Sequence, residues 1–121
     1  MVQDRLREIY LFVDDRGVSP VKEFIWALPQ DERSKANAYL GELKKQGNNL
    51  RRPMADYLRD GIYELRPKAN RIFYFFFLKD SAVLLHAMRK KTDKIPLKDL
   101  DLCIKRKERV EELAKIGKFP Q

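Results

Sequence analysis

Cysteine and histidine are nearly absent from the 121-residue sequence, which contains one of each, Cys103 and His86. A single cysteine cannot form an internal disulfide, and one cysteine with one histidine cannot supply the ligands of a zinc or iron–sulfur site. The sequence also lacks a glycine-rich phosphate loop, a Ser/His/Asp triad and a close acidic cluster that would hold magnesium. We therefore expect no metal and no cofactor, and any catalysis must depend on other residue types.

Long hydrophobic runs are missing as well. The longest strongly apolar run, residues 72–78, is too short to cross a bilayer, and the N-terminal residues are polar, unlike a signal sequence. These features predict a cytoplasmic protein that does not bind membranes. Hydrophobic residues still make up 44% of the chain, which is enough for one core, so we expect residues 1–121 to form a single domain.

Positive charge is in excess and is unevenly distributed. The chain has 26 basic and 18 acidic residues, a formal net charge of +8. Residues 59–98 contain ten of the basic residues and four of the acidic ones, whereas residues 1–41 are slightly acidic. A cationic surface concentrated in this way indicates an anionic partner, with a solvated basic face that binds nothing as the alternative.

Turn residues and hydrophobic periodicity divide the chain into alternating helix and strand segments. The order β-α-α-β-β-β-α predicts an α+β domain in which helices pack against an antiparallel sheet. The third expected strand is apolar on both faces, which is typical of a central strand. The expected elements are a strand at 9–13, a helix beginning at Ser19-Pro20, a helix at 31–46, strands at 61–67, 71–78 and 82–88, and a helix after Pro96 with Leu97, Leu100 and Ile104 facing inward and Lys105, Arg106 and Lys107 facing outward.

The last three strands predict a meander that brings basic residues together at one edge of the sheet. Arg66 ends the first of these strands, Arg71 begins the second, and Arg89, Lys90 and Lys91 follow the third. Because the strands are antiparallel, these ends lie side by side. Like charges gathered in this way repel one another unless an anion such as phosphate lies among them. The cluster therefore predicts a phosphate-binding site.

Less specific interpretations apply to the same residues. Glu64 lies on the same strand face as Arg66, so Arg66 and Arg71 are alternatively ion-paired residues of the sheet. The basic run after the third strand is alternatively a solvated strand end. A lone histidine such as His86 is more often a hydrogen-bonded structural residue than a proton donor, and Cys103 lies beside apolar helix positions, which favours the core.

Three linked motifs resemble those of the phage-derived, HigB-like branch of the RelE/ParE toxin superfamily. They are GIYELRP at 61–67, RIFYFF at 71–76 and LLHAMRKKTDKIP at 84–96, and the helix start SPVKEF at 19–24 also fits. The resemblance covers roughly residues 7–112. It implies a RelE-like fold with two N-terminal helices, an antiparallel sheet and a C-terminal helix.

Members of this superfamily are toxins of type II toxin–antitoxin pairs. Many cut messenger RNA in the ribosomal decoding site, and the antitoxin of HigB-like pairs is usually a helix-turn-helix DNA-binding protein. The resemblance therefore implies a metal-independent endoribonuclease that inhibits growth. Its implied partners are messenger RNA on the ribosome and a cognate antitoxin.

The resemblance also suggests which residues act. Arg66 matches the arginine at the end of the family's Leu-Arg strand, whose role is to bind the scissile phosphate. RNA supplies its own nucleophile, the 2′-hydroxyl, so the protein has to orient the attack and stabilise the charge that develops on phosphate oxygens. The general acid and base stay open among His86, Lys90, Lys91 and Tyr63. The candidate catalytic residues are Arg66, Arg89, Lys90 and His86, and the candidate RNA- or phosphate-binding residues are Lys68, Arg71, Lys91 and Lys94.

The sequence departs from the better-defined members in having no clear C-terminal tyrosine or histidine after Arg106. Two alternatives to RNA cleavage therefore stay open. One is a non-enzymatic module that only binds its antitoxin, and the other is a ParE-like inhibitor of DNA gyrase.

Overall fold

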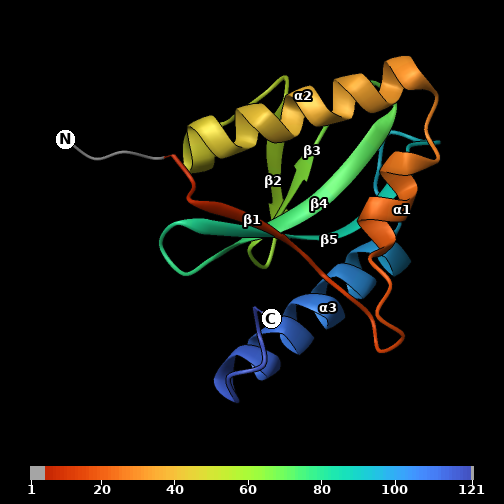
Figure 1. Cartoon of the computed structure of the whole chain (residues 1–121). Coiled ribbons are helices and arrows are strands. Elements are labelled where there is room, and N and C mark those ends of the chain that lie inside the picture. The colour runs from red at the N-terminus through yellow and green to blue at the C-terminus, as the bar shows by residue number, and fades with distance from the viewer. Residues whose placement is uncertain (1–4, 121) are drawn as a thin grey trace.

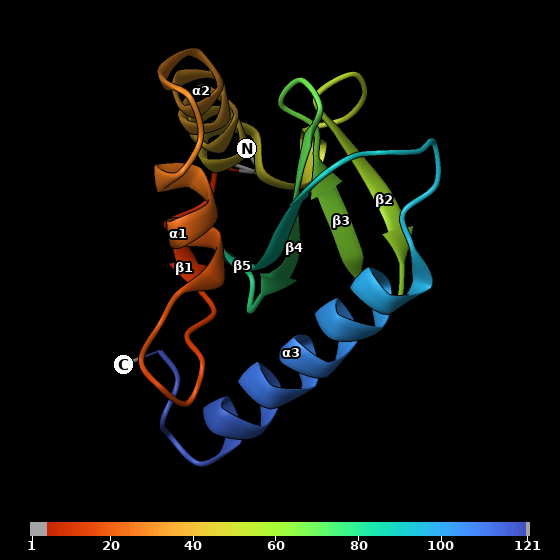
Figure 2. The same cartoon turned by 90° about the vertical axis from the view of Figure 1, so that its right-hand side faces the viewer.

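The computed structural model describes residues 5–120 and contains three helices, a short 3-10 turn and five strands. Helices α1 and α2 lie on one face of the sheet and α3 lies on the other (Figures 1 and 2). This arrangement confirms the predicted α+β class. The elements are β1 (Glu8–Leu11), α1 (Pro20–Trp26), α2 (Gln30–Gln46), η1 (Gly47–Asn49), β2 (Ala55–Arg59), β3 (Ile62–Leu65), β4 (Asn70–Phe77), β5 (Ser81–Arg89) and α3 (Leu97–Lys115).

The strands are arranged in the order β1-β5-β4-β3-β2. The first strand pairs parallel with the last, with Glu8 opposite Ser81, and all other neighbours are antiparallel. The apolar strand β4 is therefore central, as predicted, because it has a partner on each side. A parallel pair needs a crossover, and α1 and α2 lie in the long connection that provides it.

Alternate residues of β4 fill two separate cores. Ile72 and Tyr74 pack under α1 and α2, whereas Phe73 and Phe75 pack against α3. This alternation follows from the pleat of a strand, whose successive side chains point to opposite faces. Cys103 of α3 is fully buried in the second core, as predicted, and burial raises the pKa of its thiol to about 12.

The two N-terminal helices begin and end at residues suited to those positions. In α1 the Ser19 hydroxyl accepts a hydrogen bond from the Lys22 amide at 3.3 Å, and Pro20 follows as the first helical residue. Proline 29 separates α1 from α2, which has acidic residues in its first turn and basic residues in its last turn. Acidic side chains near the positive N-terminal end of the helix dipole and basic side chains near its negative C-terminal end stabilise both ends of the helix.

The structure contains one strand, β2, in a segment for which the sequence predicted neither a helix nor a strand. Strand β2 pairs with β3 through the two-residue turn Asp60-Gly61, in which φ is +51° and +81°. Two consecutive residues with positive φ are typical of the type I′ hairpin turn, and Asp-Gly is one of its preferred sequences. The segment 55–59 has no apolar run, so its hydrophobicity alone gave no strand signal.

Helix α3 faces the sheet differently from the prediction. The Leu97 side chain was expected to point inward but is 67% exposed, so the first residue of the helix points to solvent. Arg106 was expected to face solvent. Instead, its guanidinium donates a hydrogen bond to the Leu85 carbonyl at 2.8 Å and lies 5.0 Å from the ring centre of Phe12. Among the described residues, no helix is long and apolar enough to span a membrane.

Candidate functional site

A groove lies on the α3 side of the sheet and is lined by residues of β2, of the ends of β3 and β4, and of the connection that leads from β5 towards α3. Figure 2 shows how these elements are arranged. The volume of the groove is about 530 Å³. Six basic and three acidic side chains line it, and it is termed the basic groove below. The basic residues are Arg52, Arg59, Arg66, Arg71, Lys90 and Lys94, and the acidic residues are Asp56, Glu64 and Asp93.

The strand ends meet at one edge of the sheet, as the meander predicts. Leu65 at the end of β3 lies opposite Ile72 of β4, and Arg71 of β4 lies opposite Met88 of β5. The Lys90 amide then donates a hydrogen bond to the Ala69 carbonyl at 2.7 Å. This register brings Arg66, Arg71 and Lys90 to the same groove although they are distant in the sequence.

Arg66 and Arg71 share one buried carboxylate, Glu64. The Arg66 guanidinium is hydrogen-bonded to Glu64, and the Arg71 guanidinium lies 3.7 Å from it. Arg71 is only 5% exposed and also donates hydrogen bonds to the Lys68 and Asn70 carbonyls at 2.9 and 2.7 Å. Burial, together with the nearby charge of Arg66, lowers the pKa of Arg71. Arg71 therefore stabilises the hairpin, and Arg66, which is 19% exposed, is the more accessible of the two arginines in the groove.

The remaining cations of the groove are closer to solvent. Arg52 is paired with Asp56 at 2.9 Å, and Lys90 lies 3.6 Å from Asp93. Lys94 makes no ion pair with any residue that the structure describes. Arg59 is paired with Asp60 at 3.0 Å, so six cations share four carboxylates. The groove therefore has a local excess of positive charge and attracts anions.

Two of the predicted site residues lie on the opposite face of the sheet, which corrects the expected cluster. Arg89 pairs with Glu32 of α2 at 2.7 Å, and Lys68 pairs with Asp31 at 3.0 Å. Hydrogen bonds from Asn70 and Arg89 lower the pKa of Glu32. The topology argument placed the strand ends at one edge but did not take into account that Arg89 and Lys90 point to opposite faces. These pairs fasten α2 to the sheet.

Three further candidates lie outside the basic groove. The His86 Nε2 atom lies 2.8 Å from Asp99 Oδ1 of α3, and the imidazole stacks on Phe73 with ring centres 5.6 Å apart. Burial lowers the pKa of His86. Tyr63 is on the α2 face, where its hydroxyl donates to Asn48 Oδ1 at 3.3 Å. Lys91 is exposed and is not among the residues that line the groove.

Two basic residues of the groove, Arg52 and Arg59, were not predicted from the sequence. Arg52 precedes β2 and Arg59 ends it, and no strand was predicted in this segment, so neither residue was placed in a cluster. The Asp60-Gly61 turn signal predicts a strand on each side of the turn and thus would have found Arg59. Within residues 5–120, no group of three His, Cys, Asp or Glu side chains is placed to hold a metal ion.

Comparisons with known proteins agree with this architecture. A family model described as phage-derived protein Gp49-like matches residues 23–108. No curated protein matches the chain. A chain in the crystal structure of the toxin–antitoxin complex RelBE2 from Mycobacterium tuberculosis is similar in fold, with a TM-score of 0.50 and 15% sequence identity over 74% of this chain and 100% of that chain. These findings confirm the resemblance stated from the strand motifs: the chain belongs to the Gp49-like family of phage-derived proteins, and its fold is RelE-like.

Proposed function

We propose that the chain is the toxin of a type II toxin–antitoxin pair and that it cuts messenger RNA on the ribosome. The observation that carries this proposal is the basic groove, in which Arg66, Lys90 and Lys94 come together beside a surplus of positive charge. The phosphate backbone of RNA is the anion that such a surface suits best in a small protein without a nucleotide-binding loop. Family membership and the RelE-like fold support the same proposal.

The proposed chemistry needs no bound metal. The ribose 2′-hydroxyl attacks the adjacent phosphorus and gives its proton to water, a 2′,3′-cyclic phosphate forms, and the bond to the 5′-oxygen of the next nucleotide breaks. Arg66 stabilises the negative charge that grows on the non-bridging oxygens, because a guanidinium donates two parallel hydrogen bonds to phosphate. The departing 5′-oxygen takes up a proton. Of the four acid–base candidates, Lys90 alone lines the groove, so we assign this role to it.

Substitution of Arg66 tests the proposal directly. When the protein is induced alone in bacteria, we expect growth arrest and transcripts with new 5′ ends inside reading frames. Arg66→Ala should abolish both effects, because a missing phosphate-stabilising group costs about 100-fold or more in rate. The matched control is Lys68→Ala, which removes a cation from the other face of the same hairpin and should leave cleavage intact.

Other outcomes would contradict the proposal in distinct ways. Intact transcripts accompanied by DNA breaks would favour gyrase as the target. Growth that is unaffected by induction of the folded protein would favour a module that only binds its antitoxin. If the Arg66→Ala variant still arrests growth and still produces the same new transcript ends as the unaltered protein, Arg66 is not part of the site.

A further inference from the structure

Strand β5 contains one extra residue relative to its neighbour β4. Phe73 lies opposite His86, but the next residue of β4, Tyr74, lies opposite Leu84, so Leu85 is inserted between the two pairs. An insertion of this kind is a β-bulge, which shifts the alternation of side chains along the rest of its strand by one residue. The bulge therefore decides which residues at the end of β5 face the basic groove.

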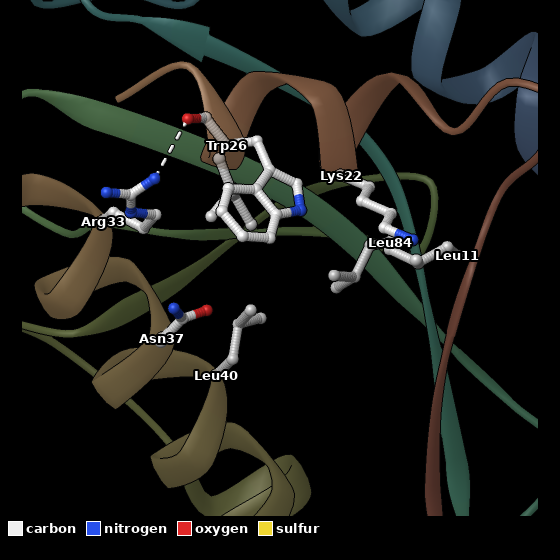
Figure 3. A pocket seen from close by; sticks show the side chains of 8 residues that line it. Leu11, Lys22, Trp26, Arg33, Asn37, Leu40 and Leu84 are labelled. Carbon is white, nitrogen blue, oxygen red and sulfur yellow. Dashed lines mark hydrogen bonds between the residues drawn. The ribbon is translucent and has the colours of Figure 1, made fainter. Parts of the chain in front are cut away.

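The side chains on each side of the bulge show this shift. Leu84 points into an apolar groove formed with α1 and α2, which has Trp26 at its rim (Figure 3). The next two residues, Leu85 and His86, both lie on the opposite face. Leu85 is buried in the core beneath α3, and the His86 ring stacks on Phe73 of the same core. Two successive side chains on one face are the result of the inserted residue.

Regular alternation resumes after the bulge and sets the faces of the two cations at the end of β5. Arg89 pairs with Glu32 of α2, and Lys90 lines the basic groove on the other face. A strand without the inserted residue would exchange the two, because a slip of one residue moves every side chain to the other face. The bulge is thus the feature that gives the basic groove Lys90 rather than Arg89.

The side chain of Arg106 on α3 is held at this bulge. Its guanidinium donates a hydrogen bond to the Leu85 carbonyl at 2.8 Å and lies 5.0 Å from the ring centre of Phe12. Within residues 5–120 it forms no ion pair, whereas Lys107 and Arg109 of the same helix both pair with carboxylates. A bulge removes backbone groups from the ladder, and a buried carbonyl without a donor is unfavourable. Arg106 therefore satisfies a backbone group of the bulge instead of a counter-charge.

A second contact from α3 holds the other residue of the bulge. Asp99 lies about two turns before Arg106, on the same side of the helix. Its Oδ1 atom lies 2.8 Å from His86 Nε2. Leu85 and His86 are thus both fixed to α3 by polar contacts.

We propose that Arg106 is a positioning residue of the RNA-cleaving site, which holds the β5 bulge and thereby directs Lys90 into the basic groove. This inference rests on the proposed function, because it takes Lys90 to be the proton donor to the departing 5′-oxygen. Arg106 is not among the residues that line the groove, so it acts through the strand and not on the RNA. The strand ends where the Lys90 amide donates to the Ala69 carbonyl at 2.7 Å.

Kinetics of the Arg106→Met variant test the proposal. Methionine keeps an unbranched apolar side chain but removes the donor to the Leu85 carbonyl. With messenger RNA on purified ribosomes, kcat should fall by about 10- to 100-fold, because a misplaced acid slows the chemical step. KM should stay within about twofold, because Arg66 and Lys94 still bind phosphate.

Two further variants complete this experiment. Arg106→Lys should restore part of kcat, because an ammonium group on a long side chain can also donate to the Leu85 carbonyl. The matched control is Arg109→Met, which removes a 50% exposed arginine from the same helix and should leave kcat unchanged. An unchanged kcat in Arg106→Met, or an equal loss in Arg109→Met, would overturn the inference.

A double-mutant cycle distinguishes positioning of Lys90 from a general loss of structure. If Arg106 acts through Lys90, Arg106→Met should lower kcat by less than about twofold when Lys90 is already alanine. A merely structural role would lower kcat by the same factor in both backgrounds. Equal factors would overturn the inference, and so would a Lys90→Ala variant that cuts as fast as the unaltered protein.

Hydrogen exchange separates a failure of this inference from a failure of the proposed function. The Lys90 amide should exchange at least about tenfold faster in Arg106→Met and at an unchanged rate in Arg109→Met. If the unaltered protein cuts messenger RNA while Arg106→Met keeps both its kcat and the protection of this amide, the proposed function stands and the positioning role is wrong. If the unaltered protein does not cut messenger RNA, the proposed function fails and the positioning role fails with it.

Discussion

At the scale of single residues, Glu64 sets the charge that the groove presents. One carboxylate, itself 4% exposed, serves two guanidinium groups, so the trio of Glu64, Arg66 and Arg71 keeps a net positive charge. Its Oε1 atom has no hydrogen-bond partner among the described residues. A phosphate that binds Arg66 therefore competes with a carboxylate that is already shared.

Replacement of Glu64 should be costly for folding. Glu64→Gln keeps the shape of the side chain but leaves two arginines, one of them fully buried, without a counter-charge. We expect the free energy of unfolding, measured by urea denaturation, to fall by about 3 kcal/mol. The control is Glu42→Gln, which removes the partner of Lys45 on the surface and should change the value by less than about 0.5 kcal/mol. Equal effects would show that the buried trio is not a stabilising network.

Some of the residues that line the basic groove could be predicted from the sequence. Arg66, Arg71 and Lys90 were found because strand order places their backbones at one edge. Arg89 was predicted on the wrong face of the sheet, because strand order does not say to which face a side chain points. Knowledge of the β4–β5 register would have resolved this, since Arg89 lies opposite Asn70 rather than Arg71. Register depends on a bulge near Phe73, which the sequence does not reveal.

At the scale of elements, helix α3 is joined to β5 by polar contacts in addition to its apolar face. His86 of β5 lies 2.8 Å from Asp99, and Arg106 donates a hydrogen bond to the Leu85 carbonyl. Both contacts are shielded from solvent. They fix the direction of α3, and this direction sets the position of the preceding connection that carries Lys94 into the basic groove.

The buried histidine makes stability depend on pH. Because the pKa of His86 is lowered in the folded protein, the unfolded chain binds more protons as pH falls through the ordinary histidine value of about 6.5. The free energy of unfolding should therefore be highest above about pH 7 and should decrease towards about pH 5.5. His86 is the only histidine of the chain, so His86→Gln should remove this slope in urea denaturation series. A slope that persists in the variant would assign it to other groups.

Elements with strong local signals were predicted within a few residues, and the one with a weak signal was not. Helices α1 and α2 have a cap, separating proline and terminal charges, and β4 is an almost continuous apolar run. Strand β2 has none of these. Its pairing with β3 comes from the Asp60-Gly61 turn and from long-range burial of Ala55 beneath α2, which only the folded chain shows.

At the scale of the whole molecule, the two faces of one sheet differ in chemistry. The α3 face presents a groove of charged side chains, and the α1–α2 face presents an apolar groove with a tryptophan at its rim. The sheet between them is continuous from β1 to β2. A partner on one face therefore does not need to displace a ligand on the other.

Affinity for RNA should be strongly dependent on salt. Arg66, Lys90 and Lys94 line the groove, and each phosphate contact that such cations make with single-stranded RNA releases counter-ions. A tenfold rise in salt concentration should therefore weaken binding by about 100-fold, as measured by fluorescence anisotropy with a short labelled RNA. Lys22→Glu lies on the other face and should leave that slope unchanged. An affinity that is insensitive to salt would exclude phosphate contacts as its source.

The parallel pairing of β1 with β5 affects how this protein emerges during synthesis. Residues 8–11 find their partner only after residues 81–84 have been made, and α3 closes the second core later still. The edge where Arg66 and Lys90 converge is therefore incomplete on a nascent chain until these last segments have left the exit tunnel. The complete basic groove therefore forms only after residues 94–100 have been made.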